Sequence, residues 1–482
     1  MSFPIFKSLR DFYENYEMPL ARALFHVSNR GLLVDQGRLL DYKNLLEAET
    51  NDCLEKASSV LGKEVVGVGS KSKTGVKIAS PAAVLKAIKS LNIEIPKTRK
   101  GEIWVEDSTG ATTLQRIFAK TGNEFVWQVI RHRELQEMRS FSNVQLLDSI
   151  LYSTYKATGT KSGRRSSSEN YLGLGTNGQN LPKHSKLGMQ FRRCIVARPG
   201  KIFIFCDQKG AEDWIVHAII ADQTEGRITV GVDELQKGIN RHRKLASLIF
   251  SKPEDEIEKS SIEYFLGKKT RHAGNYGMRG QTYSDQLASK GIHIPATACD
   301  FFLEKFHKAE PWIQQVFQAY VEQELTTRRS LTTPIGRYRD FLSLRSYSDN
   351  SKIFRDAYSY IPQSTVGDNT GLAILGIENA SPGIVVADHH DAIGTEVENN
   401  IDTIVHTVNT MSKAFDREIV FPKGFSIRIP VEFEMGFNLG EMKTCEDLSR
   451  VGLTSIWNTL NPHPSRPDVT ISGAQQLQSQ QV

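Results

Sequence analysis

Residues 201–220, KIFIFCDQKGAEDWIVHAII, contain the change of pattern that decides the fold. The continuous apolar run KIFIF (201–205) predicts a buried strand. That run ends at Cys206 and Asp207, and AEDWIVHAII (211–220) then predicts a helix. A carboxylate at the end of a buried strand is held rigidly at the edge of a sheet, so Asp207 is a candidate functional residue. Capping a turn is the more frequent role of a single aspartate at such a place.

A second polar stretch, VADHHDAIGT (386–395), lies within a pattern of two short strands joined by a tight turn. Asp391 stands at a strand–turn junction. Two carboxylates at neighbouring strand ends could hold the pair of divalent cations that phosphoryl transfer needs. Adjacent strand residues point to opposite faces, so His389 and His390 cannot both face one metal, and Mg²⁺ prefers oxygen ligands. The residues alone do not connect Asp391 with Asp207.

The rest of the chain shows helical patterns first and then strands interleaved with a helical insertion, which predicts an α+β fold. Residues 63–75 are rich in Gly, Ser and Lys and predict a mobile loop. Residues 458–482 include NPHPSRP and QQLQSQQ and predict a disordered tail. The other predicted elements are helices within 17–60 (ending once at Gly31), 80–91, 124–151 and 242–325, and a strand at 431–437.

The composition is that of an ordinary soluble protein, with 39% hydrophobic and 24% charged residues. A chain of 482 residues is long enough for two or three subdomains. It has no apolar run long enough to span a membrane, and its N-terminus has no signal-peptide pattern. The five dispersed cysteines form no CxxC pair. This usage favours a reducing compartment, which predicts a cytoplasmic location and no membrane partner.

Basic residues gather in two places although the net charge is only +5. Residues 156–201 contain ten Lys or Arg and one acid, and residues 268–279 contain four more and no acid. Such local fields predict a polyanion-binding surface, with an incidental basic face as the alternative. In LGKKTRHAGNYGMRG, Lys268, His272 and Tyr276 share one helix face at i, i+4 and i+8. That row could hold a triphosphate and stack on a base.

Eight segments, in chain order, resemble motifs of the family A DNA polymerases, the bacterial DNA polymerase I type. A single one of these motifs is loose, but eight in the order of the family are highly specific. The resemblance covers about residues 13–440. The segments are YENYEMPLARALFHVSNRGLLVD (13–35), SGRRSSS with TNGQNLP (162–182, like TGRLSS…PNLQNIP), FCDQKGAED (205–213, like motif A), NRHRKLASLIF (240–250), KKTRHAGNYG (268–277, like motif B, RRxAKxxxFG), TPIGRYR (333–339), RDAYSYIPQSTVGD (355–368) and HHDA (389–392, like motif C, VHDE).

The resemblance implies a right-hand fold with an antiparallel-sheet palm, helical fingers and a helical thumb. It also implies template-directed DNA synthesis, in which a primer 3′-hydroxyl attacks the α-phosphate of a dNTP. The implied domains are 1–155 (N-terminal segment and thumb), 156–222 (palm, with motif A and primer–template contacts), 223–330 (fingers, with motif B), 331–457 (palm, with motif C) and 458–482 (tail).

The resemblance also assigns roles to individual residues. Asp207 and Asp391, with the backbone carbonyl of Gln208, would bind two Mg²⁺ ions, for which Mn²⁺ could substitute. His272 or Arg271 would take over from the motif B lysine that neutralises the triphosphate and protonates pyrophosphate. The implied dNTP-binding residues are His242, Lys268, Arg271, His272, Tyr276 and Glu212, the last as a steric gate against ribose. The implied DNA-binding residues are Arg164, Asn177, Gln179, Asn180, Arg337, Arg355, Gln363 and His390.

Several positions depart from the family pattern. Motif C ends in Ala392 where the family has glutamate, which removes an auxiliary carboxylate and leaves both principal aspartates. In motif B, Lys268 and His272 replace an arginine and a lysine. Gly280 stands where the bacterial enzymes have a tyrosine that places the template base. These departures put a non-catalytic DNA-binding paralogue beside the polymerase as an alternative.

The partners implied by the resemblance are primer–template DNA and dNTPs. The match begins within the first twenty residues, which leaves no room for a preceding proofreading exonuclease, so a separate exonuclease, helicase-primase or processivity factor could act with the chain. A short polymerase with drifted motifs is typical of a phage-like enzyme of viral DNA replication, acting in the cytoplasm of a host. A single-subunit RNA polymerase and a metal-dependent nuclease are further alternatives; Glu212 argues against the first.

Overall fold

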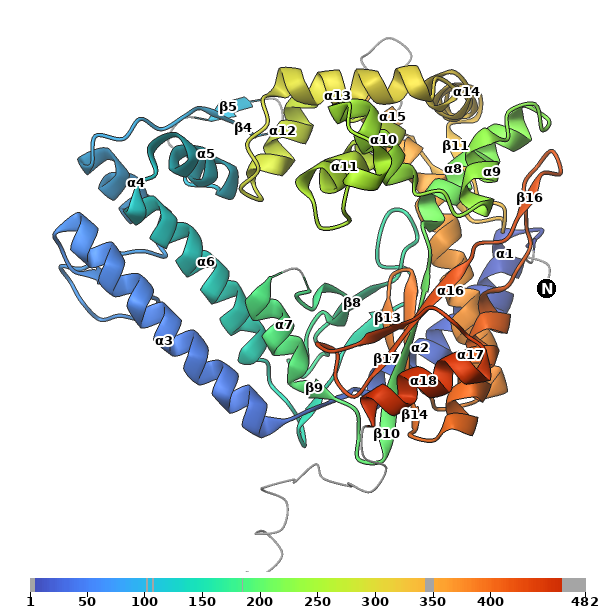
Figure 1. Cartoon of the computed structure of the whole chain (residues 1–482), viewed down its shortest axis with the longest axis horizontal. Helices are drawn as coiled ribbons and strands as arrows, with labels where there is room; N and C mark the ends of the chain where they lie inside the picture. Colours follow the sequence, from blue (N-terminus) through green and yellow to red (C-terminus); the bar gives the residue numbers. More distant parts are fainter. Residues whose placement is uncertain (1–4, 101–102, 106–107, 184, 343–350, 462–482) are drawn as a thin grey trace, which may run out of the picture. The chain divides into compact units, whose positions relative to one another are not determined.

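The computed structural model describes residues 5–100, 103–105, 108–183, 185–342 and 351–461 (Figure 1). The chain divides into two compact units. The first, here called the sheet unit, comprises Met1–Asp41, Asn143–Gly238 and Gln315–Val482. The second, the helical unit, comprises Tyr42–Ser142 and Ile239–Gln314. The helical unit therefore combines the larger parts of the segments predicted as thumb and fingers, and their other parts lie in the sheet unit. The predicted domain boundaries stay a prediction.

A five-stranded antiparallel sheet forms the centre of the sheet unit. The apolar run at 201–205 forms a strand, as predicted, and this strand continues to Gln208. It lies in the middle of the sheet and is paired along both edges. A continuous apolar run is typical of such a buried strand. The strand order is β13 (Val385–His389), β14 (Ala392–Glu398), β10 (Lys201–Gln208), β17 (Val431–Gly436) and β18 (Lys443–Cys445).

Helices cover one face of this sheet. The helix α17 (Ile401–Phe415) packs on β10, β14 and β17, and α16 (Tyr360–Ala380) packs on α17, β13 and β14. Buried residues occur all round α16, which is typical of a helix enclosed by other elements. The helices α8 (Ala211–Gln223) and α2 (Met18–Arg30) pack on α16 in turn. Gly31 ends α2 with a positive φ of 55°, as its predicted helix-ending position requires.

Shorter elements complete the sheet unit. They are α1 (Leu9–Phe12), a π-helical turn (Tyr13–Glu17), β1 (Leu32–Val34), β6 (Ile150–Leu151), β7 (Thr154–Lys156), β8 (Ser166–Ser168), a 3-10 turn (Gly178–Asn180), α7 (Lys186–Arg193), β9 (Ile195–Val196), α9 (Val230–Gln236), α14 (Ala319–Arg328), β11 (Ser330–Thr332), β12 (Tyr338–Asp340), α15 (Ser351–Tyr358), β15 (Ile419–Val420), β16 (Ser426–Ile427) and α18 (Arg450–Leu460). The predicted disorder of 458–482 is wrong for residues 458–460, which end α18, and lies outside the described residues from 462 onward.

The helical unit is built mainly from long amphipathic helices. The thiol of Cys53 on α3 (Gln36–Leu61, which begins in the sheet unit) donates to the carbonyl of Gln128 on α6 (Glu124–Ser142) at 3.2 Å. The predicted helix at 124–151 ends earlier, because the chain leaves it after Ser142 and later joins β6. The predicted loop at 63–75 contains β2 (Val65–Val66), which pairs with β3 (Val76–Lys77).

A second group of helices in this unit holds the basic motif. The helix α11 (Ile262–Asn275) packs against α10 (Arg241–Phe250) and α13 (Ala296–Ala309). The remaining helices are α4 (Pro81–Ser90), α5 (Ala111–Thr121) and α12 (Gly280–Ala288), and a small hairpin pairs β4 (Thr98–Lys100) with β5 (Ile103–Val105). In the described part of the chain, no helix has the length and apolarity to cross a membrane. All five cysteines are buried and free, as expected from their spacing.

Candidate active site

The sheet brings Asp207 and Asp391 together although 184 positions separate them. The strand β10 pairs with β14 so that Asp207 lies opposite Ala392, the residue that follows Asp391. The backbone N–H of Gln208 donates to the carbonyl of Asp391 at 3.3 Å. The two strand-end aspartates are therefore close together, as predicted. The antiparallel register of β10 and β14, which the sequence does not reveal, brings them together.

A buried arginine supports the turn that carries Asp391. Nε and Nη2 of Arg165 donate to the carboxylate of Asp388 at 2.7 and 2.8 Å, and both side chains are buried, at 2% and 0% exposure. The same guanidinium donates to the carbonyls of Gly367 and His390. His390 has a φ of 62°, a conformation that non-glycine residues seldom adopt. The Arg165–Asp388 pair thus fixes the backbone on the N-terminal side of Asp391.

Asp207 lies among other carboxylates in a buried part of the site. Burial raises the pKa of Asp207, and the nearby carboxylates of Asp391 and Glu432 raise it further. The Oδ1 atom of Asp207 is buried and has no hydrogen-bond partner. Close carboxylates with an unsatisfied buried oxygen suit a hard divalent cation such as Mg²⁺ or Mn²⁺. Within the described residues, no group of three or more His, Cys, Asp or Glu is arranged to hold a metal.

Gln208 contributes through its backbone, because its side chain is used elsewhere. The amide Nε2 donates to Oγ1 of Thr370 at 2.8 Å, and Oε1 accepts from Asn369 at 2.7 Å, both on α16. These bonds tie the end of β10 to the covering helix. They hold Asp207 in place and leave the carbonyl of Gln208 as the atom that could face a cation.

His389 lies in the wall of this site as an uncharged packing residue. Burial, reinforced by Arg192 and Lys183, lowers its pKa to about 3, so its ring is neutral near pH 7. The ring meets Phe205 edge to face at a centroid distance of 5.7 Å. Phe205 in turn lies across Gly394, where an added Cβ would come within 2.4 Å of the phenyl ring. Burial also lowers the pKa of His390, with Arg164 as the next cause.

The predicted steric gate and a predicted primer contact meet in the sheet unit. Glu212 lies in the first turn of α8, and its carboxylate accepts a hydrogen bond from Nη2 of Arg164. Both side chains keep about a quarter of their surface exposed, at 25% and 23%. Each remains accessible to a ligand while it fixes the position of the other.

The other predicted DNA-binding residues differ in their internal hydrogen bonds and in their exposure. Asn177 caps the 3-10 turn that follows it and accepts from Ser167, while Gln179 donates to Asp388 at 3.3 Å. Asn180 is exposed, and Arg355 and Gln363 are half-buried.

Arg337 is enclosed by acidic and aromatic side chains. Its guanidinium donates to Asp368 at 2.7 to 3.1 Å and to Glu17 at 2.9 Å, and it lies 4.8 Å from the ring centroid of Phe12. Its charge is therefore already used within the sheet unit, where it joins the N-terminal segment to α16.

The basic helix of the helical unit has two different sides. Lys268 and His272 are exposed one turn apart on α11, and Tyr276 forms its C-cap. The rings of His272 and Tyr276 meet edge to face at 5.0 Å, so the predicted shared face exists. His242 lies in the first turn of α10, where it packs on Tyr264 at 6.0 Å.

Arg271 occupies the buried side of α11. It donates to both carboxylate oxygens of Glu310, at 3.1 and 2.7 Å, and is 3% exposed. Arg241 donates to the same carboxylate at 2.6 Å. The geometry therefore favours His272 over Arg271 as the group that this helix presents to a ligand.

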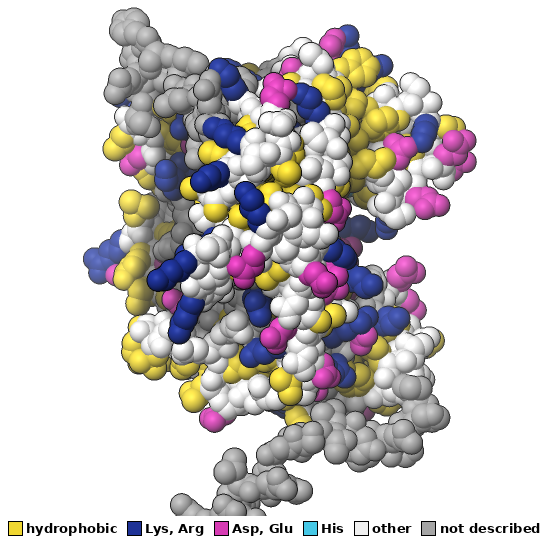
Figure 2. All heavy atoms as spheres, turned by 90° about the vertical axis from the view of Figure 1, so that its left-hand side faces the viewer, with side chains coloured by type: hydrophobic (Ala, Val, Ile, Leu, Met, Phe, Trp, Pro, Cys, Tyr) yellow, Lys and Arg dark blue, Asp and Glu magenta, His cyan; other side chains and the backbone are white. Residues whose placement is uncertain are grey.

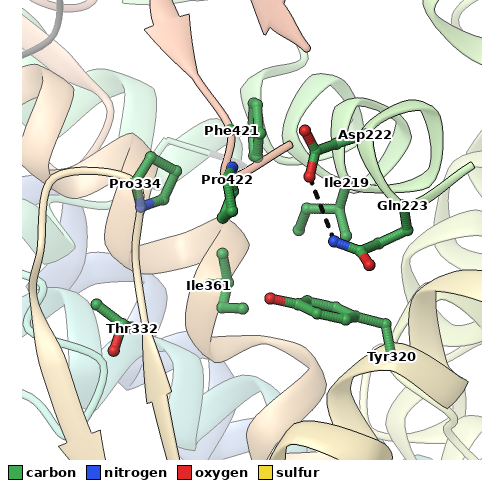
Figure 3. Close-up of a pocket in the computed structure, with 9 residues that line it drawn as sticks. All are labelled: Ile219, Asp222, Gln223, Tyr320, Thr332, Pro334, Ile361, Phe421 and Pro422. Carbon is green, nitrogen blue, oxygen red and sulfur yellow. Dashed lines mark hydrogen bonds between the residues drawn. The ribbon is translucent and has the colours of Figure 1, made fainter. Parts of the chain in front are cut away.

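Surface charge and pockets add less to the site. Figure 2 shows Lys and Arg side chains interspersed with Asp and Glu on the face it displays. Part of the predicted basic field is neutralised internally, since Arg165 pairs with Asp388 and Arg198 with Glu396. The pocket in Figure 3 involves none of the predicted site residues. Its acid, Asp222, accepts from Gln223 and from two backbone N–H groups of residues 423 and 425.

Sequence reasoning missed two features of this site. Arg165 stands where the quoted motif TGRLSS has leucine. That change could have indicated that Arg165 has a buried acidic partner, which is Asp388. Glu432 left no such signal, because only the register of β17 against β10 places it opposite Asp207.

The antiparallel sheet joins an aspartate on its central strand to one in the neighbouring hairpin turn. Residues 43–441 match the family described as DNA polymerase family A, and the chain belongs to this family. The α+β prediction is confirmed by the likeness to a solved structure described as "POL domain of Pol1 from M. smegmatis complex with DNA primer-template and dNTP". The TM-score is 0.71 at 22% identity, over 89% of this chain and 71% of that one.

Two curated relatives bear the name "DNA polymerase I, thermostable". The protein from Thermus aquaticus is 23% identical over 439 residues, which cover 88% of this chain and 47% of that protein. A protein from Thermus thermophilus is 24% identical over 375 residues, or 75% of this chain and 40% of that protein. This chain therefore spans less than half the length of these relatives.

Proposed function

We propose that the chain is a template-directed DNA polymerase that adds dNTPs to a primer 3′-hydroxyl. Family membership supports this activity, and the observation that carries it is the register that sets Asp207 beside Asp391. The related mycobacterial structure is described as a complex with primer–template and dNTP, which supports the same two partners.

The carboxylates of Asp207 and Asp391 and the carbonyl of Gln208 would hold two Mg²⁺ ions, or Mn²⁺ in their place. Such a pair activates the attacking oxygen and stabilises the leaving oxygen in an in-line displacement. The protein holds these ligands rigidly, through the pairing of β10 on both edges and through the Arg165 contact with the motif C turn.

In the helical unit, the exposed side of α11 would bind the incoming nucleotide. Lys268 and His272 would contact the triphosphate, and His272 could give a proton to the leaving pyrophosphate. His242, at the start of α10, would add a contact where the helix dipole favours anions. Tyr276 would pack on the base and sugar. Arg271 supports this helix through Glu310.

In the sheet unit, Glu212 would fill the space of a ribose 2′-hydroxyl, with Arg164 holding it in place. Arg164, Gln179, Asn180, Arg355, Gln363 and His390 would contact the primer–template, mostly at phosphates and in the minor groove, without reading sequence. Asn177 and Arg337 would act indirectly, by fixing the loops in which these residues lie.

Primer extension by the wild type and by Asp207→Ala and Asp391→Ala tests this function. Each substitution should lower the rate by at least about 10³-fold, because it removes a metal ligand from phosphoryl transfer. Both variants should stay folded, since each removes one of two like charges. Thermal unfolding checks that point.

The same gel separates the alternatives. A wild type that is inert with both Mg²⁺ and Mn²⁺ would favour the DNA-binding paralogue, and shortening of the primer would favour a nuclease. A preference for rNTPs over dNTPs would favour an RNA polymerase, against the assignment of Glu212 as the gate.

A further inference from the structure

Asp207 has a different neighbour on each side in the sheet. On β14 its direct partner is Ala392, the position at which motif C of the family has glutamate. On β17 its direct partner is Glu432. The chain has therefore lost a carboxylate on one flank of Asp207 and has one on the other flank.

The register places Glu432 on the same face as Asp207. Residues directly opposite each other in an antiparallel pair point to one face, with Cβ atoms about 4.5–5.5 Å apart. Exposure along β17 agrees, since Glu432 and Glu434 are exposed while Phe433 and Met435 are buried. The same face of β10 carries Phe205 and Asp207, which pair with Glu434 and Glu432.

Glu432 and Asp207 place two carboxylates side by side on one face of the sheet. No described side chain donates a hydrogen bond or an ion pair to its carboxylate. Like charges directly opposite each other destabilise a sheet. A bound cation would offset that cost, so the placement of Glu432 makes physical sense as part of a metal site.

We propose that Glu432 supplies the auxiliary carboxylate of the active site, in place of the glutamate that Ala392 lacks. This inference rests on the proposed polymerase function. Glu432 would act outside the direct ligands Asp207 and Asp391. From the β17 side it would attract the cations and orient their bound water, as groups outside the inner ligand set commonly do.

The test compares three variants. Glu432→Gln removes the charge at nearly constant shape. Glu434→Gln is the matched control, since it lies on the same strand and face about 7 Å further along, opposite Phe205. The swap Ala392→Glu with Glu432→Gln moves the carboxylate to the flank on which the family has it. Mn²⁺ binding to the protein–primer–template complex is measured by electron paramagnetic resonance, and Mg²⁺ dependence by primer extension.

Glu432→Gln should weaken Mn²⁺ binding and raise the Mg²⁺ requirement about tenfold, in the range seen when such outer groups are removed. Glu434→Gln should match the wild type, and the swap should recover most of the loss. Equal binding by Glu432→Gln and wild type, equal loss in both single variants, or no recovery in the swap would each overturn the inference. A wild type that extends primers normally keeps the polymerase proposal intact in all of these cases.

Discussion

Two pairs of adjacent residues are arranged alike. They are Arg164–Arg165 in the sheet unit and Arg271–His272 in the helical unit. In each pair one residue is buried on a carboxylate and its neighbour is more exposed. Arg165 binds Asp388 while Arg164 reaches Glu212 near the surface. Arg271 binds Glu310 while His272 is exposed on α11.

The pairs differ in how much their buried arginine is needed. Asp388 is fully buried and depends on Arg165 for its cation, with only a longer amide contact from Gln179. Glu310 has a second cation, Arg241, at 2.6 Å. The comparison teaches that each motif leaves one residue more exposed and buries its neighbour on a carboxylate. The cost of losing the buried arginine depends on which other groups neutralise that carboxylate.

The largest expected effect is that of Arg165→Met. It leaves the buried carboxylate of Asp388 without its cation, which should lower the free energy of unfolding by about 3–5 kcal/mol. The turn before Asp391 should also loosen, and primer extension should fall with it. Urea unfolding measures the stability change.

The double variant Arg165→Met with Asp388→Leu is the control for this prediction. Replacing both charges with apolar groups of similar volume should recover most of the lost stability. If the single variant lies within about 1 kcal/mol of wild type, the pair is not the support for the turn that its geometry indicates.

Smaller losses of stability are expected for substitutions on α11. Arg271→Met should cost less stability than Arg165→Met, because Arg241 still neutralises Glu310. His272→Gln should change stability by no more than about 0.5 kcal/mol, as exposed substitutions do. It should nevertheless lower kcat for dNTP addition by about 10²-fold if it is the proton donor. Single-turnover kinetics at saturating dNTP compare Arg271→Met with His272→Gln. A larger kinetic loss in Arg271→Met would favour Arg271 over His272 as the proton donor.

The last effect appears only as the pH falls and concerns a buried histidine of the helical unit, in contrast to the exposed His272. Burial, with Arg139 and Arg133, lowers the pKa of His132 to about 4. An unfolded histidine binds its proton near pH 6.5, so the unfolded state holds more protons between pH 6.5 and 4, and stability is lost as the pH falls through this window. His132→Leu should remove up to about 3 kcal/mol of that dependence. Thermal unfolding of both proteins from pH 7 to 4 tests it, and parallel curves would contradict the prediction.

Much of the fold could be predicted from pattern alone. The apolar run before Asp207 and the glycine after α2 each indicated the correct element, because local chemistry sets them. The helix predicted at 80–91 also forms, as α4. The helix predicted at 124–151 was too long, since α6 ends at Ser142. The short strands within 63–77 are fixed by pairing between segments and have no periodicity of their own.

The site was predictable only where a motif marks it. Asp207 and Asp391 follow from strand ends and from the family pattern, but their proximity depends on the register of β10 against β14. The burial of Arg271 and Arg337 could not be read from the sequence, since a basic side chain looks the same whether it meets phosphate or an internal carboxylate. The roles of Asp388 and Glu432 depend on Arg165 and Asp207, which lie more than 200 positions away in the sequence.

The central place of β10 gives the two aspartates unequal local stability. The strand that ends beyond Asp207 is hydrogen-bonded on both edges, so the loss of one neighbouring strand still leaves it paired with the other. Asp391 lies in a turn beside β13, one of the two outer strands of the sheet, and this turn is held by Arg165 and by the backbone N–H of Gln208. We expect local opening to loosen this turn before the end of β10 that carries Asp207, because β10 stays paired when one neighbouring strand is lost.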